Sequence, residues 1–232
     1  MIKRGWSMNI PADKYNVAWF KLAECVSRGE KERALGVYRL LSHSLSDKAF
    51  ASQLEGDILS AFDDKNSAKE RYNRAISLYK KDKRLLEMAA IGENMHFLYP
   101  KDRFYIELLI DTYTSLSIKY KATVYLNKFV TLSLGERDEP AAIDILDRYE
   151  ATVAANELVI IRQQLVYALV KTNSLPFEQV IQQIKKTIDG LWLTTNNDTN
   201  KNHNFALQQF LASIQELNDD YYLHATEYLD QH

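Results

Sequence analysis

The side chains that most often carry out chemistry are few in this sequence and widely spaced. The five histidines are His43, His96, His203, His224 and His232. None of them belongs to an H-E-x-x-H motif, the spacing that places two imidazoles around a zinc ion. The seven glycines are scattered, so the chain has no glycine-rich phosphate loop, and it has no G-x-S-x-G nucleophile elbow. We therefore predict no catalytic residue, no metal site and no cofactor.

The remaining reactive groups also have simple structural explanations. The carboxylate pairs Asp63-Asp64 and Asp219-Asp220 fall at the ends of predicted helices, where capping and the helix dipole account for them. The single cysteine, Cys25, excludes an internal disulfide and a cysteine zinc site. Its apolar neighbours predict a buried structural thiol. These patterns indicate a protein that is not an enzyme.

Charge and hydropathy exclude two further classes. The chain has 29 basic and 31 acidic residues, whereas a nucleic-acid binder usually has a basic excess or a dense basic patch. The short basic runs, Lys80–Arg84 and Lys185-Lys186, are predicted to lie on solvated helix faces or turns. No run of about 18 apolar residues predicts a membrane span. Residues 1–9 lack the apolar core of a signal peptide, and Met1 and Met8 are both possible starts. We expect a cytoplasmic protein.

The elements that must position any binding residues are helices. Glycine and proline are scarce, with seven and four copies, and apolar residues recur with a period near 3.6. The predicted helices, about twelve, are 14–28, 31–43, 47–62, 66–80, 83–98, 102–116, 119–134, 138–151, 155–172, 176–194, 203–217 and 220–230. Connections of two to five residues predict antiparallel hairpins. Helix-end signals include the sequence Ser67-x-x-Glu70, which matches a capping box, and Gly29 and Gly135, which can end helices.

The strongest pattern in the chain is an internal repeat. Ala34, Tyr38 and Leu41 recur 34 positions later as Ala68, Tyr72 and Ala75. A third copy, Ala122, Leu126 and Phe129, follows the second after 54 positions (122 − 68). This spacing leaves an additional helix at 83–98. It is either a separate helix or joined to 66–80 through a bend at Lys80–Arg84.

The repeat resembles the tetratricopeptide repeat family over residues 14–134. The residues that carry the resemblance are Gly56, Leu59, Ala68, Tyr72 and Ala75, with Trp19, Leu22 and Ala23 at the opening and Tyr99-Pro100-x-Asp102 at a closing turn. A weaker similarity, to the soluble NSF attachment proteins, rests on Tyr72, Ala75, Ile76 and Tyr79 followed by Leu86, Ala89 and Ala90. Both families are built from helical hairpins.

The resemblance implies an α-solenoid, a right-handed superhelix of stacked hairpins, and a division of the chain. Residues 1–13 would form an N-terminal extension, and 14–151 the repeats with the irregular helix 83–98. Residues 152–232 would form a helical extension or cap containing a polar loop at 194–204. Such stacks expose apolar surface at their ends, which a cap covers.

In this family the concave face holds a partner peptide or helix, so the resemblance implies a non-enzymatic adaptor or scaffold, of which a chaperone-like protein is one form. The implied binding residues are Lys21, Glu24, Phe50, Gln53, Asp57, Phe104, Glu107 and Asp111. Family members that clamp a chaperone's terminal carboxylate use basic and amide side chains, whereas this chain has Asp57 and Asp111. We therefore expect an acidic groove that favours a basic or mixed-charge segment. The alternative is a constitutive subunit of a larger complex or of a homodimer, which a large apolar surface would favour.

Overall fold

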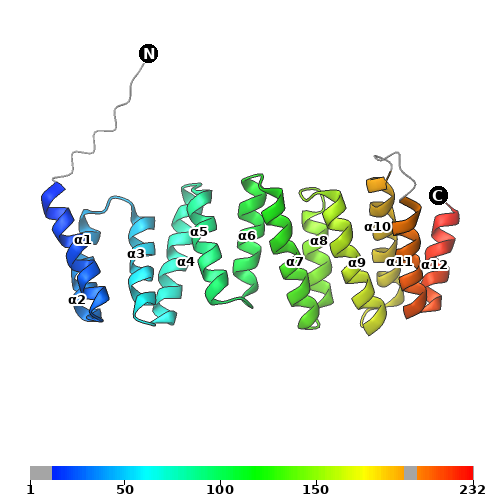
Figure 1. Ribbon diagram of the computed structural model, residues 1–232, viewed down its shortest axis with the longest axis horizontal. Helices are drawn as coiled ribbons and strands as arrows, with labels where there is room; N and C mark the ends of the chain where they lie inside the picture. The colour runs from blue at the N-terminus through cyan, green and yellow to red at the C-terminus, as the bar shows by residue number, and fades with distance from the viewer. Residues whose placement is uncertain (1–11, 196–202, 232) are drawn as a thin grey trace, which may run out of the picture. The chain divides into compact units, whose positions relative to one another are not determined.

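The protein, seen here in a computed structural model that describes residues 12–195 and 203–231, forms twelve α-helices and no strand within those ranges (Figure 1). The helices are α1 (Ala12–Ser27), α2 (Lys31–Ser44), α3 (Lys48–Ala61), α4 (Lys65–Lys81), α5 (Leu85–Leu98), α6 (Arg103–Ser115), α7 (Lys119–Gly135), α8 (Glu139–Tyr149), α9 (Ala155–Thr172), α10 (Phe177–Thr195), α11 (His203–Leu217) and α12 (Asp219–Asp230). The predicted all-α class is confirmed, and each bound lies within two residues of its expected position. Most of the predicted extension 1–13 and of the polar loop 194–204 lies outside the described residues.

The chain divides into two compact units, residues 1–95 and 96–232, with the boundary inside α5. In the first unit, α1 packs on α2, α2 on α3, and α3 on α4. In the second unit, α6 packs on α7, α7 on α8, α8 on α9, α9 on α10, and α11 on α12. In these pairs, helices that are adjacent in sequence are also neighbours in space, as expected for a solenoid of hairpins. No described helix has both the length and the apolar character needed to cross a bilayer.

The core of the first unit is built from the apolar stripes of α1, α2 and α3. Leu22 and Cys25 of α1, and Ile58 of α3, pack with a stripe of α2 that consists of Ala34, Val37, Tyr38 and Leu41. The stripe repeats at the 3.6-residue period, which places its members on one side of the helix. Cys25 is buried in this cluster, as its apolar neighbours predicted.

The core of the second unit combines aliphatic and aromatic side chains, and it also buries two charged residues, Glu139 and Arg162. Its fully buried aliphatic members include Leu109, Ile110, Leu126, Val130, Leu146, Leu165, Val166, Leu169 and Ile184. Arg162 in α9 has an exposed fraction of only 2%. A buried guanidinium needs paired partners, and Asp147 of α8 and Gln183 of α10 supply them.

Five helix–helix connections use the same tight turn. In each turn, one residue takes a left-handed backbone and the next residue donates its N–H to a carbonyl one turn back in the preceding helix. At Lys83, for example, φ is 55°, and the Arg84 N–H donates to the Tyr79 carbonyl oxygen at 2.9 Å. The left-handed residues are Gly29, Asp63, Lys83, Ser117 and Arg137. The 6→1 hydrogen bond is that of a Schellman-type helix end, which usually places glycine in the left-handed position.

One expectation about a helix start was wrong. Ser67 does not begin α4; Asp64 caps the helix, and its carboxylate accepts the Ser67 N–H at 3.3 Å. A carboxylate is a good acceptor for an exposed backbone N–H at a helix N-terminus, where the dipole favours negative charge. At the other expected helix end, α7 does stop at Gly135, and Arg137, two residues later, takes the left-handed position.

The helix at 83–98 is separate from its predecessor. α4 ends at Lys81 and α5 begins at Leu85, with the left-handed Lys83 between them. The turns also show a longer period than 34 residues. Gly29, Lys83 and Arg137 are 54 positions apart in succession (83 − 29 and 137 − 83), so three helices separate equivalent turns. The third predicted copy of the repeat therefore follows this 54-residue spacing.

Candidate partner-binding site

The polar residues predicted on α3 are already bonded within the first unit. The hydroxyl of Tyr72 donates to Asp57 at 2.7 Å, and the hydroxyl of Tyr79 donates to Gln53 at 2.9 Å. Burial raises the pKa of the Asp57 carboxyl, and the hydrogen bond from Tyr72 opposes that increase. Asp57, Gln53 and Phe50 form a row along α3, and the ring centroid of Phe50 lies 6.5 Å from that of Trp19 in α1. These side chains therefore hold α3 against its neighbours.

The corresponding residues on α6 are bonded in the same manner within the second unit. Arg148 of α8 pairs with Glu107, and the hydroxyl of Tyr149 donates to Asp111. Burial is the main cause that raises the pKa of Tyr149, and the nearby carboxylate of Asp111 adds to it. Phe104 stays exposed at the start of the row. The predicted residues thus fall into separate rows on α3 and α6 rather than into one cluster within a unit.

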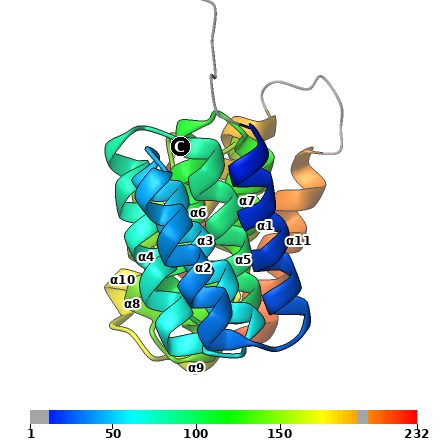
Figure 2. The ribbon, with the colours of Figure 1, turned by 90° about the vertical axis from the view of Figure 1, so that its left-hand side faces the viewer.

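Lys21 and Glu24 belong to a different feature, a groove between α1 and α2, which lie side by side (Figure 2). The groove has a volume of about 600 Å³. Its lining residues are Lys21, Glu24, Cys25, Arg28, Glu30, Arg33, Gly36, Val37, Arg39 and Leu40. At Gly36, no atom lies within 4 Å of the position that a Cβ would take, so α2 is open to solvent there.

Large apolar side chains are exposed on and beside this groove. Leu40, which lines it, is 75% exposed, and Phe20 and Val17 on α1 are 77% and 67% exposed. Val17 and Phe20 lie on the same stripe of α1 as Lys21 and Glu24, because residues three and four positions apart share a helix face. The opposite stripe of α1, which includes Leu22, is buried against α2 and α3. This outer stripe therefore exposes two large apolar side chains beside two charged ones, and no element among the described residues covers it.

The charges around the groove leave a basic surplus. Arg28 pairs with Glu24 at 2.6 Å, and Arg33 pairs with Glu30 at 3.0 Å. Lys21 and Arg39 also line the groove, and neither has an ion-pair partner among residues 12–195 and 203–231. Unpaired cations beside exposed apolar side chains favour a ligand that brings both carboxylates and apolar groups.

The sequence prediction missed Phe20, Leu40 and Val17. A signal for them was present, because each is a large apolar residue that falls off the buried stripe of its helix. Isolated exposed apolar residues are common in folded proteins, however, so the sequence alone did not distinguish these three. Only their exposure in the folded first hairpin identifies them as a group.

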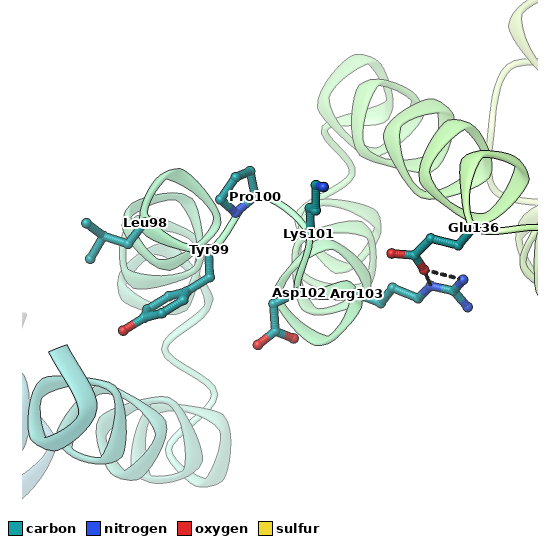
Figure 3. A pocket seen from close by; sticks show the side chains of 7 residues that line it. All are labelled: Leu98, Tyr99, Pro100, Lys101, Asp102, Arg103 and Glu136. Carbon is teal, nitrogen blue, oxygen red and sulfur yellow. Dashed lines mark hydrogen bonds and ion pairs between the residues drawn. The ribbon is translucent and has the colours of Figure 1, made fainter.

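A second hollow, of about 670 Å³, lies at the connection between α5 and α6 in the second unit (Figure 3). It is lined by Leu98, Tyr99, Pro100, Lys101, Asp102, Arg103 and Glu136. Figure 3 shows Arg103 directed at Glu136, and the two side chains are 2.7 Å apart. Arg103 also pairs with Asp138, and this hydrogen bond lowers the pKa of the Asp138 carboxyl. The guanidinium is thus already neutralised by two carboxylates that fix the turn.

His96 lies in the last turn of α5, beside a lysine and a tyrosine of α7. Its ring lies edge-on to Tyr125 with centroids 5.5 Å apart, and Lys128 approaches its Nε2 to 3.3 Å. Burial, followed by the charge of Lys128, lowers the pKa of His96. In the described ranges, no three His, Cys, Asp or Glu side chains are grouped so that they could hold a metal ion.

Comparison with known proteins adds no relative. No protein-family model matches the chain, and no curated protein matches it at a significant level. The tetratricopeptide resemblance therefore rests on the motif residues alone.

Proposed function

We propose that this protein is a non-enzymatic helical scaffold of the tetratricopeptide kind that binds a partner protein in the groove between α1 and α2. The observation that carries the proposal is a groove lined by the exposed Leu40, with exposed Val17 and Phe20 on the helix α1 that borders it. Contiguous apolar surface rimmed by polar groups is characteristic of protein-interaction sites. Lys21 and Glu24, which the resemblance implied as binding residues, line this groove.

The form of the groove favours a helix as its ligand. It runs between two antiparallel helices, and a third helix laid on such a pair continues the packing that the rest of the unit uses. Three exposed apolar side chains on α1 and α2 supply the contacts, and four basic side chains lie at the rim. The α3 and α6 rows are a less favourable surface, because their polar groups already bond within the protein.

Affinity purification with matched variants tests the proposal. The groove variant changes Phe20 and Leu40 to Asp, and the control variant changes Ile160, an exposed apolar residue on α9, to Asp. We expect a stoichiometric partner with the wild-type protein and with the control, and none with the groove variant. Far-UV circular dichroism must show equal helicity for all three proteins. If the same partner binds all three equally, the groove is not the binding site.

A further inference from the structure

The charges of the chain are distributed unequally between its two units. Residues 1–95 contain 17 of the 29 basic residues and 13 of the 31 acidic ones, a net charge of +4. Residues 96–232 contain the other 12 and 18, a net charge of −6. Opposite net charges on two parts of one chain favour contact between unlike parts of different copies.

Within the acidic unit, α12 has an outward stripe that matches the groove in character. Its buried side is fixed by Tyr221, whose ring stacks on Phe177 at 4.6 Å between centroids and whose hydroxyl donates to Asn173 at 3.2 Å. The outward side carries Leu223, which is 55% exposed. Four carboxylates surround it along the helix: Asp219, Asp220, Glu227 and Asp230. Of these, Glu227 faces His224 at 3.4 Å.

This stripe complements the α1–α2 groove in its charge and in its exposed apolar side chain. The groove has the exposed Leu40 and the unpaired cations Lys21 and Arg39, with the exposed Phe20 on the bordering helix α1. The α12 stripe has an exposed leucine among carboxylates. A charge-matched rim around apolar contacts speeds association and selects the correct partner. Each surface is thus suited to the other, and they belong to different units.

We propose that the partner of the groove is a second copy of this chain, whose α12 lies in the α1–α2 groove with Leu223 against Phe20 and Leu40. The inference rests on the groove of the proposed function and names its occupant. The carboxylates of α12 then face Lys21 and Arg39. Because the two surfaces differ, the contact is heterologous, and each copy can bind one neighbour at each surface. Such contacts produce rings or open chains.

Two other occupants fit the charges less well. Residues 1–11 of the chain contain Lys3 and Arg4 and no acidic residue, so they do not complement a basic rim. A symmetric contact between two α1–α2 grooves places the Lys21 and Arg39 of one copy near those of the other. Like charges brought together in this way oppose association.

Sedimentation velocity of the full-length protein at rising concentration tests the proposal. We expect the weight-average mass to increase with concentration at low salt, and the increase to be smaller at high salt, because salt screens the rim charges. The groove variant changes Phe20 and Leu40 to Asp, and a second variant changes Asp220 and Leu223 to Lys. Each variant alone should stay monomeric, and an equimolar mixture should form a one-to-one dimer and nothing larger. The Ile160→Asp control should assemble as the wild type does.

Three results would overturn the proposal. One is a wild-type protein that stays monomeric at every concentration. Another is an assembly that survives both sets of substitutions. A third is a wild-type monomer that assembles only after removal of residues 1–11, which would assign the groove to the chain's own N-terminal segment. If self-association fails while the groove variant still loses a different stoichiometric partner, the proposed function stands and only this inference falls.

Discussion

The buried charge cluster at the junction of α8, α9 and α10 permits a quantitative prediction. Arg162 is 2% exposed, and its Nη2 lies 3.0 Å from Asp147 and 3.4 Å from Glu150. Its Nη1 donates to the side-chain oxygen of Gln183 at 3.0 Å. The Lys186 ammonium also forms an ion pair with the Asp147 carboxylate at 2.8 Å. The cluster therefore has one cation that is fully buried and two carboxylates that are partly exposed.

The two partners should respond differently to substitution. Asp147→Asn leaves the buried guanidinium with only Glu150 as an anionic partner, and loss of a partner from a fully buried pair costs about 3–5 kcal/mol. Because the Asp147 side chain is 36% exposed and Glu150 remains, we expect a loss of about 2 kcal/mol. Arg162→Met removes the buried charge and keeps most of the volume, so we expect a change within about 1 kcal/mol. Asp147 keeps Lys186 in that variant.

Hydrogen–deuterium exchange measures this difference where it occurs. Amides of α8, α9 and α10 in Asp147→Asn should exchange about 30-fold faster than in the wild type, since 1.36 kcal/mol corresponds to a factor of ten. Amides of α1–α4 belong to the other unit and should keep the wild-type rate, which provides an internal control. If Arg162→Met speeds exchange as much as Asp147→Asn does, the ion pair is itself stabilising and the reasoning is wrong.

The same cluster should make the second unit sensitive to acid. Burial acts to raise the pKa of Asp147, but hydrogen bonds from Lys186 and Arg162 and their charges hold it below the ordinary value. A carboxyl with a lowered pKa contributes stability above its unfolded pKa, about 3.9, and loses that contribution as the pH falls through its folded pKa. The exchange rates of Asp147→Asn and the wild type should therefore begin to converge as the pH falls below about 4.

Three further predictions concern single positions. A Cβ at Gly190 would lie 2.6 Å from Val159 Cγ2, so Gly190→Ala should cost about 1–3 kcal/mol in thermal unfolding, and adding Val159→Ala should recover part of it; equal stability of the single variant would contradict the packing. Gly29→Ala at φ 72° should lower the free energy of unfolding by about 1 kcal/mol, whereas Lys83→Gly at φ 55° should raise it by about 0.5 kcal/mol. If urea unfolding shows that Gly29→Ala stabilises the protein and Lys83→Gly destabilises it, this account of the turns is wrong. Burial raises the pKa of Tyr38 to about 12, so wild-type stability should fall above about pH 10, and Tyr38→Phe should reduce that fall in denaturant titrations; an unchanged slope would show that Tyr38 is not responsible.

The repeat residues illustrate how local pattern predicted packing. Ala34, Ala68 and Ala122 are all buried, as expected for small residues where two helices cross. Tyr38 and Tyr72, one predicted period apart, are buried as well. The 3.6-residue period of the apolar stripes carries this information along the chain without reference to distant contacts.

The candidate site was less predictable for a physical reason. The roles of Asp57 and Asp111 depend on which tyrosines reach them, and those tyrosines are 15 and 38 positions away. Periodicity places a side chain on a helix face but does not say whether a neighbouring helix bonds to it. The resemblance suggested a groove of free carboxylates, and in the structure both carboxylates accept a hydrogen bond from a tyrosine.

The sequence by itself determined the helices, their bounds and the residues that face the core, because helix formation and amphipathic burial are properties of neighbouring residues. It did not determine the turn at Lys83, where the chain reverses without glycine or proline because the packing of flanking helices compensates the strain of a left-handed lysine. Only the tertiary structure decided which apolar residues stay exposed. Phe20 and Leu40 resemble core residues in the sequence, and they form a candidate surface because no described helix covers that side of the first hairpin.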